Sequence, residues 1–366
     1  MFYRSKAHIG NGLILAVLFQ MICTAESFAI PSVSLLNATV KPKNDFESAV
    51  GLLKQRQFGK AEIAFKQLLP QLDGRDNKKV ADILNYIGVA LRAQKKENEA
   101  ARYFRLALAK LPADSSKEKI MRAKVLSNLS STYLSQKKIA LATETCSEAV
   151  TLFRLAGGSP KDLAVLLNTY GRLKMENHDF KEAESLFNES LKLRQKASGD
   201  TSIEVLAPLI NLSALYLQQK RFSQAEQVCQ RALDICQQHE MSNNALFFSA
   251  LSNLAEAQLE TEQFRSAAAT YKHALKISDK QFGAYSQESL AILLNLSEAA
   301  EGSGQREIAR ETLRRAVDLC RIVFGSQDNR TLQATEALAD LEQGYGNLSE
   351  ARRLRFLSRL SRKRSP

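Results

Sequence analysis

The sequence predicts an all-α protein built from repeated helical hairpins, and three observations lead to this prediction. Hydrophobic residues make up 45% and charged residues 25% of the 366 residues, a globular composition with enough apolar material for a large core. The chain has only 16 Gly, 7 Pro and no Trp, and it is rich in side chains that lose little rotamer freedom in a helix. The third observation is an internal repeat.

One alanine marks the repeat. It recurs at Ala61, Ala100, Ala142, Ala183, Ala225, Ala267, Ala309 and Ala351. Another small residue stands twelve positions before each of them, at Ala49, Gly88, Ser130, Gly171, Ser213, Ala255, Ser297 and Ala339. Two helices pack closely only where their contact residues are small, so each unit is predicted to be an antiparallel pair of helices that cross at these two slots.

The pattern resembles the tetratricopeptide repeat, whose signature is a small residue in the first helix and then alanine, an aromatic residue and alanine in the second. Residues 80–112 match it with Gly88, Ala100, Phe104 and Ala107. The longer repeats that follow are similar to those of kinesin light chains and related bacterial proteins. The resemblance implies a right-handed α-solenoid of about eight helical hairpins over residues 43–350, with the end of the last helix and a basic tail at 351–366.

The first 29 residues read as a signal peptide. Arg4 and Lys6 precede an apolar run over residues 13–23, and the small residues Ala25 and Ala29 follow it. The run is shorter than the ~20 residues of a comfortable bilayer crossing, so an uncleaved anchor is the weaker alternative. The sequence therefore predicts an exported protein, periplasmic in a bacterium or secreted, with a flexible leader at residues 30–42.

No catalytic apparatus is visible. Four cysteines remain after the signal peptide, but the repeat separates them, which predicts buried free thiols rather than disulfides. The histidines are scattered without ligand spacing, and no phosphate-binding loop or nucleophile motif occurs, so neither an enzyme nor a cofactor is expected. The formal net charge is +12, but most of it lies in the last residues, which argues against a nucleic-acid groove.

Asparagine recurs two residues before the small slot, at Asn128, Asn211, Asn253 and Asn295. The resemblance implies that first helices line a concave groove, where asparagines hold the backbone of a bound protein or extended peptide. A carboxamide can accept from a peptide N–H and donate to its C=O, which suits any extended ligand. The alternative is that these side chains are solvated or bond neighbouring helices.

The tail carries seven basic residues, Arg352, Arg353, Arg355, Arg359, Arg362, Lys363 and Arg364. Ala351, Leu354, Leu357 and Leu360 are expected to form one apolar stripe. One interpretation is a solvated end helix that caps the array. The other is contact with an anionic membrane surface or an acidic partner, which would make the protein a membrane-surface adaptor.

Overall fold

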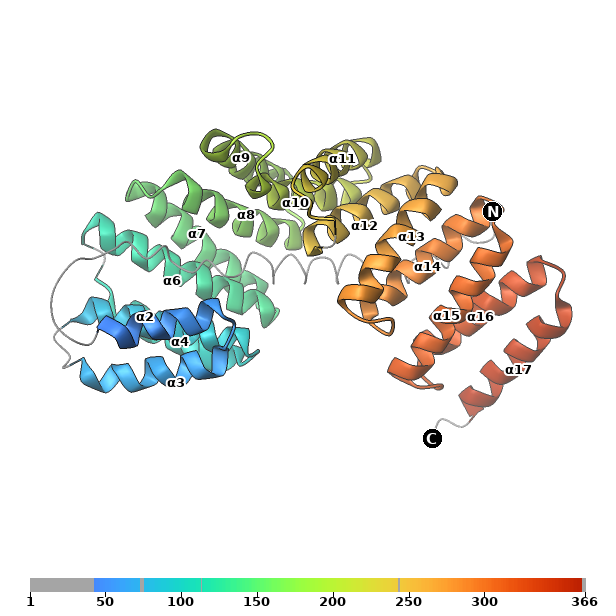
Figure 1. The fold of residues 1–366 in the computed structure, drawn as a ribbon, viewed down its shortest axis with the longest axis horizontal. Helices are drawn as coiled ribbons and strands as arrows, with labels where there is room; N and C mark the ends of the chain where they lie inside the picture. Colours follow the sequence, from blue (N-terminus) through green and yellow to red (C-terminus); the bar gives the residue numbers. More distant parts are fainter. Residues whose placement is uncertain (1–42, 73–75, 113, 243, 364–366) are drawn as a thin grey trace. The chain divides into compact units, whose positions relative to one another are not determined.

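The computed structural model describes residues 43–72, 76–112, 114–242 and 244–363. The predicted signal peptide and the whole of the predicted leader lie outside this part of the chain. The described residues form helices and no strand (Figure 1), as the sequence predicts. Among them, no helix is both long enough and apolar enough to cross a bilayer.

The described helices pair into eight hairpins, and they divide between two compact units that meet in sequence at Pro208 and Leu209. The first unit contains α2 (Lys43–Lys54), α3 (Phe58–Leu68), α4 (Asn77–Ala93), α5 (Glu97–Lys110), α6 (Ser116–Ser135), α7 (Ile139–Leu155), α8 (Pro160–Glu176) and α9 (Phe180–Ser198), with the 3₁₀ helices η1 (Leu69–Gln71) and η2 (Ile203–Val205). The second contains α11 (Phe222–Gln238), α12 (Ala245–Glu260), α13 (Phe264–Gln281), α14 (Gln287–Gly302), α15 (Arg306–Phe324), α16 (Asn329–Gly344) and α17 (Leu348–Lys363), preceded by α10 (Leu206–Gln218), which begins three residues before the boundary.

The two helices of each hairpin cross at the predicted slots. All eight slot alanines are buried. A Cβ atom on Gly88 would lie 2.6 Å from Cε1 of Phe104, and one on Gly171 would lie 2.6 Å from Cε1 of Phe187. Where the slot is Ser130, its Oγ donates to the carbonyl oxygen of Ala142 at 2.7 Å. The small residues are therefore needed because the opposing helix occupies the space.

The turn inside every hairpin uses one left-handed residue, five positions before the slot alanine. These residues are Arg56, Lys95, Lys137, His178, Lys220, Glu262, Gly304 and Gly346, with φ between 57° and 84°. Six of them are not glycine, so their residue types do not indicate this conformation, which costs a non-glycine residue about 1–2 kcal/mol. Because the turn is the same in every described hairpin, each second helix begins three residues before its slot alanine.

Because proline lacks a backbone N–H and clashes with the preceding turn of a helix, the sequence predicts that Pro208 bends or loosens the start of its helix. The structure places η2 immediately before α10, and Pro208 is the third residue of α10. In the first turn of a helix the backbone N–H groups have no intrahelical partner, so a proline costs no hydrogen bond there. The expected loosening is therefore confined to the 3₁₀ turn of η2.

Candidate peptide-binding face

The four predicted asparagines lie on first helices, Asn128 on α6, Asn211 on α10, Asn253 on α12 and Asn295 on α14. Each is at most 5% exposed. Asn253 Nδ2 donates to Ser213 Oγ of the preceding first helix at 2.7 Å. Asn295 Nδ2 donates to the phenol oxygen of Tyr271 at 2.9 Å.

Asn128 follows the same rule in the first unit. Its Nδ2 donates to Oδ1 of Asn85 on α4 at 3.0 Å. Three of the predicted asparagines thus connect neighbouring hairpins, which is the alternative that the sequence left open. The amide donors of Asn128, Asn253 and Asn295 are thus already used in packing, and peptide binding by the four asparagines stays a prediction.

The structure instead draws attention to a polar stripe on α12. This stripe follows helical spacing along one face of a helix whose other residues, apart from Gln258, are apolar, and it consists of Ser249, Ser252, Asn253, Glu256 and Glu260. Ser252 Oγ, Asn253 Oδ1 and Glu256 Oε2 are buried and have no hydrogen-bond partner among the described residues. Buried polar atoms are normally paired, so three unpaired acceptors side by side mark a candidate binding face.

Carboxylates gather at this stripe. Burial first, and then the negative charge of Glu260, raise the pKa of Glu256 to about 8. Burial also raises the pKa of Glu298 on α14, with smaller contributions from Glu260 and Glu301. The pKa of Glu301 is raised by burial as well. We call Glu256, Glu260, Glu298 and Glu301 the acidic cluster.

Three of the four first helices of the second unit lack basic residues, and the fourth, α16, carries Arg330. The sequences of α10, α12 and α14 contain no Lys or Arg. The first helices of the other unit differ, because basic residues occur on α4 (Lys78, Lys79, Arg92), α6 (Lys117, Lys119, Arg122, Lys124) and α8 (Lys161, Arg172, Lys174). In a chain with a formal charge of +12, the acidic cluster is therefore a local exception.

The repeat pattern did not predict Ser252, Glu256 or Glu298 as site residues. The signal that could have found them is polar residues at three- and four-residue spacing on a helix that otherwise reads as core. The repeat slots concealed this signal, because only asparagine recurs from unit to unit.

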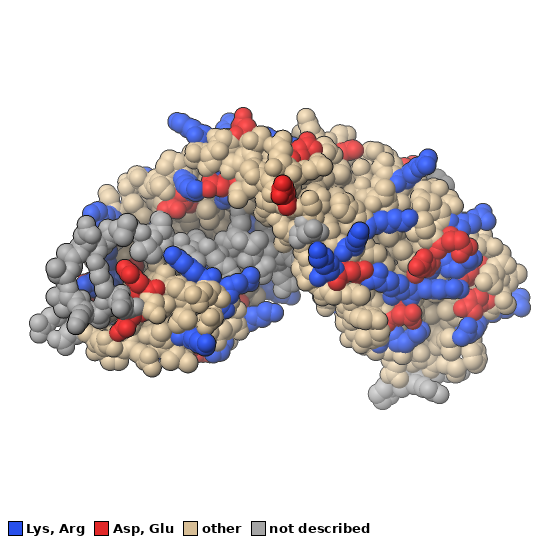
Figure 2. All heavy atoms as spheres, in the orientation of Figure 1, with Lys and Arg blue, Asp and Glu red and all other residues tan. Residues whose placement is uncertain are grey.

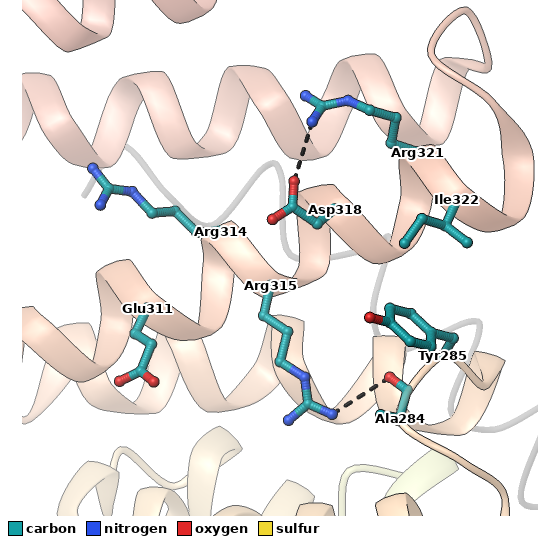
Figure 3. A pocket seen from close by; sticks show the side chains of 8 residues that line it. All are labelled: Ala284, Tyr285, Glu311, Arg314, Arg315, Asp318, Arg321 and Ile322. Carbon is teal, nitrogen blue, oxygen red and sulfur yellow. Dashed lines mark hydrogen bonds and ion pairs between the residues drawn. The ribbon is translucent and has the colours of Figure 1, made fainter.

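A surface pocket of ≈ 670 Å³ lies between α15 and the loop before α14 (Figure 3). Its arginines are all paired. Arg315 Nη2 contacts Asp279 at 2.5 Å, Arg321 contacts Asp318 at 3.1 Å, and Arg314 reaches Glu342 at 2.8 Å. Figure 2 likewise shows basic and acidic side chains interspersed over α13 to α17. The pocket therefore offers no uncompensated positive charge for a ligand.

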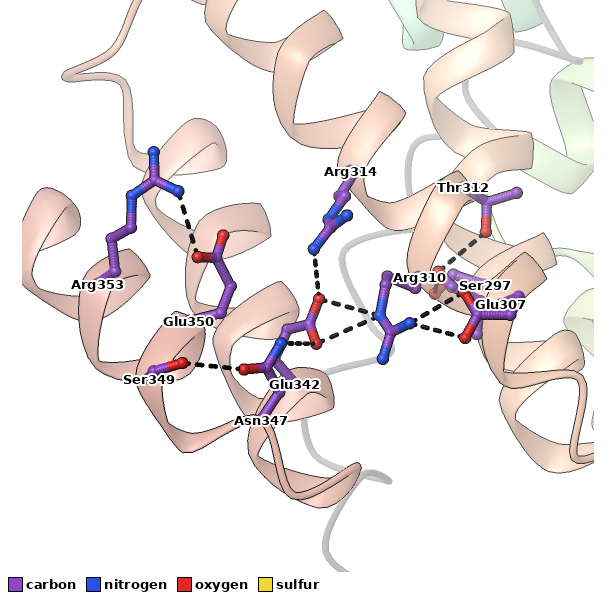
Figure 4. A network of polar contacts seen from close by, with 11 residues as sticks. Ser297, Glu307, Arg310, Thr312, Arg314, Glu342, Asn347, Ser349, Glu350 and Arg353 are labelled. Carbon is purple, nitrogen blue, oxygen red and sulfur yellow. Dashed lines mark hydrogen bonds and ion pairs between the residues drawn. The ribbon is translucent and has the colours of Figure 1, made fainter.

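Glu342, the partner of Arg314, is also the centre of a second set of contacts. Its side chain is fully buried on α16 and accepts from Arg310 Nε at 3.1 Å and Arg314 Nη2 at 2.8 Å. Asn347 Nδ2 donates to the same carboxylate at 3.2 Å (Figure 4). A buried carboxylate paired in this way holds α15 and the α16–α17 turn together, and we assign the network to structure.

The described cysteines are free and buried, as predicted: Cys146, Cys229, Cys236 and Cys320. In the described part of the chain, no group of three His, Cys, Asp or Glu side chains could hold a metal ion.

The basic tail differs from the expectation. Ala351 and Leu354 are buried, but Leu357 is 41% and Leu360 38% exposed. The predicted stripe fails because a three-residue period drifts around a helix of 3.6 residues per turn. Arg355 is tied to Asp340 at 2.9 Å. The side chains of Arg362 and Lys363, and the whole of Arg364, lie outside the described residues.

Comparison with known proteins identifies the repeats. The tetratricopeptide repeat family matches residues 162–238 and 246–322, and a second tetratricopeptide repeat description matches residues 80–110. No curated protein sequence matches the chain significantly.

Solved structures share the fold. BtubC (BKLC) from P. vanneervenii has 18% identity and a TM-score of 0.51, over 62% of this chain and 89% of that one. A putative kinesin light chain of nearly identical repeats from Podosopora anserina has 21% identity and a TM-score of 0.50, over 56% of this chain and 99% of that one. The quorum sensor NprR from B. thuringiensis, in its apo form, has 12% identity and a TM-score of 0.63, over 98% of both chains. At these identities the likeness concerns the fold.

Proposed function

Because this chain belongs to the tetratricopeptide repeat family and resembles its kinesin-light-chain-like branch, we propose that it is a non-enzymatic, exported scaffold that binds a protein through an extended peptide. The contact lies on the first helices of the second unit, where α12 and α14 carry the acidic cluster. The ligand is a segment that contains Lys or Arg. The array thus recognises a partner by charge and by peptide backbone together.

The observation that carries the proposal is the set of three unpaired acceptors on α12. Ser252 Oγ, Asn253 Oδ1 and Glu256 Oε2 are already withdrawn from water without a partner. An unpaired buried polar group costs ~1–3 kcal/mol, so a ligand that supplies donors recovers free energy that the unbound protein has lost. A peptide N–H suits the amide oxygen, and an ammonium or guanidinium group suits the carboxylate.

The acidic cluster determines the sign of the ligand's charge. Glu256 and Glu298 both have raised pKa values with burial as the main cause, so a cation placed beside them lowers the cost of ionising them. A negatively charged segment would add to the repulsion already present between the carboxylates. This difference makes charge the main determinant of specificity.

The test uses two short, unstructured, fluorescent peptides that are identical except that one carries Lys where the other carries Glu. Binding to the full chain is measured by anisotropy. We expect the Lys peptide to bind and the Glu peptide not to bind. The double variant Glu256→Gln/Glu298→Gln should weaken binding by about tenfold or more, since hydrogen bonds to charged groups contribute ~1.5–3 kcal/mol.

The matched control is Glu311→Gln, which removes an exposed carboxylate from the second helix α15. This variant should bind the Lys peptide as the parent does. Equal affinity for both peptides, or full binding by the double variant, would remove the acidic cluster from the function.

A further inference from the structure

Five second helices share a polar pattern at two outward positions, and α17 departs from this pattern. In α7, α9, α11, α13 and α15, the fifth and ninth residues after the slot alanine are polar: Ser147 and Thr151, Asn188 and Lys192, Gln230 and Asp234, Lys272 and Lys276, Arg314 and Asp318. In α17 the same two positions hold Phe356 and Leu360. The last described hairpin thus presents apolar side chains where five others present polar ones.

These side chains face solvent. Phe356 is 61% exposed, Leu357 41% and Leu360 38%. Leu360 lies three positions after Leu357 and four after Phe356, so the three side chains share one face of the helix. The buried side of α17 is supplied by Ala351, Leu354 and Ser358. The apolar face is therefore additional to the packing that holds α17 on α16.

Guanidinium groups border this face. Arg352, Arg353 and Arg359 are exposed, and Arg353 shares its charge with Glu350 in a surface pair at 3.2 Å. Glu350 is the only acidic residue of α17. An exposed apolar face with basic residues along its edges is typical of a helix that lies in the plane of a membrane interface.

We propose that the outward face of α17 binds an anionic lipid surface. Phe356, Leu357 and Leu360 enter the boundary between headgroups and acyl chains, while Arg352, Arg353 and Arg359 pair with lipid phosphates. Charge selects this occupant over a second copy of the chain, since two copies would bring the same guanidinium groups together. The site is separate from the acidic cluster and does not depend on the peptide-binding proposal.

The chain contains no Trp, so one introduced tryptophan reports on one position. The test compares Phe356→Trp with Lys272→Trp, which places the probe at the equivalent outward position of α13. Vesicles contain either phosphatidylglycerol or phosphatidylcholine. We expect a blue shift of the emission of Phe356→Trp with phosphatidylglycerol vesicles, no shift with phosphatidylcholine, and no shift of Lys272→Trp with either. The control matters because the apolar N-terminal residues of the full chain could bring it to a vesicle by another route.

A second variant tests the arginines. Arg352→Gln/Arg353→Gln/Arg359→Gln, combined with Phe356→Trp, should need more phosphatidylglycerol for the same shift, by about fivefold for each arginine removed. Equal shifts at positions 356 and 272, or no shift at 356, would overturn the proposal. A shift that follows protein concentration without vesicles would assign the face to a second copy. A shift produced by an acidic polypeptide but not by vesicles would assign it to an acidic protein.

Discussion

Glu256 shows how one buried carboxyl group can make stability depend on pH. Its pKa is raised from 4.5 to about 8, with burial as the main cause. The folded chain therefore keeps a proton that the unfolded chain releases near pH 4.5. The stabilisation from this proton is fully present below pH 4.5 and is lost as the pH rises toward 8.

Glu256→Gln should remove this dependence, because the amide stays neutral at every pH. We expect the variant to differ little from the parent at pH 5 and to be more stable at pH 8, by an amount on the order of a few kcal/mol. Urea unfolding at the two pH values measures it, with Glu311→Gln as the exposed control. A constant difference at both pH values would mean that Glu256 ionises normally in the folded chain.

The cysteines lead to a prediction about reactivity. Burial raises the pKa of Cys146 and Cys229 to about 12, and that of Cys236 and Cys320 to about 11. The thiolate is the reactive form, so all four should resist iodoacetamide in the native protein and react once it is unfolded. Peptide mass mapping before and after unfolding provides the measurement. Rapid native labelling, or a disulfide between any two of them, would contradict the hairpin register.

For the asparagines, the repeat spacing predicted their positions but not their hydrogen-bond partners. Their slot was correct, because the 42-residue spacing from Asn211 to Asn253 and from Asn253 to Asn295 does place them on successive first helices. Their partners could not be predicted, since Asn85, which receives the hydrogen bond of Asn128, lies three residues before its small slot rather than two. Hydrogen bonds between hairpins depend on side-chain reach, which a repeat spacing does not contain.

In four of the hairpins, the slot residue and the residue four positions after the alanine are matched in size. Gly88 faces Phe104, and Gly171 faces Phe187. The equivalent pairs in two other hairpins are Ser130 with Cys146 and Ser213 with Cys229. A larger slot residue thus accompanies a smaller partner, as dense packing at a fixed helix crossing requires.

This matching predicts rescue by a double substitution. Gly88→Ser alone should destabilise the chain, because its Cβ would lie 2.6 Å from the Phe104 ring. Phe104→Cys alone should cost roughly 3–5 kcal/mol by leaving a cavity, by analogy with Phe→Ala changes. The double variant recreates the Ser–Cys pair and should recover ~1–3 kcal/mol relative to the sum of the single changes. Denaturant unfolding of all four proteins measures the coupling, and simple additivity would show that the two positions do not share one space.

For the last helix, α17, the sequence pattern did not predict correctly which apolar side chains are buried. Leu357 and Leu360 were grouped with Ala351 and Leu354, whereas the structure turns them outward with Phe356. No described hairpin follows α17, so its sequence pattern contains both a packing side and a side without a described partner. Only comparison with the outward positions of the internal helices separates the two.

For the whole molecule, the slot alanines predicted the number and order of the hairpins because close helix crossings admit few residue types. The division at Pro208 was not predicted. The alanine spacing of 42 continues unchanged from Ala183 to Ala225 and on to Ala267. The local structure differs between the slot alanines Ala183 and Ala225, where the 3₁₀ helix η2 precedes α10 in place of a first α-helical turn.

The last prediction concerns how stability is shared along the array. Ala267 and Ala351 occupy the same slot and are both buried, at 0% and 1% exposure. Introducing Phe at either site overfills a helix crossing, which costs ~1–3 kcal/mol or more. The hairpin of Ala267 has described hairpins on both sides, whereas that of Ala351 has one neighbour, so the same strain should disturb two interfaces in the first case and one in the second. Ala267→Phe should therefore lower the urea midpoint more than Ala351→Phe. If the central and terminal substitutions lowered the midpoint equally, the stability of each hairpin would be its own and stacking would add little.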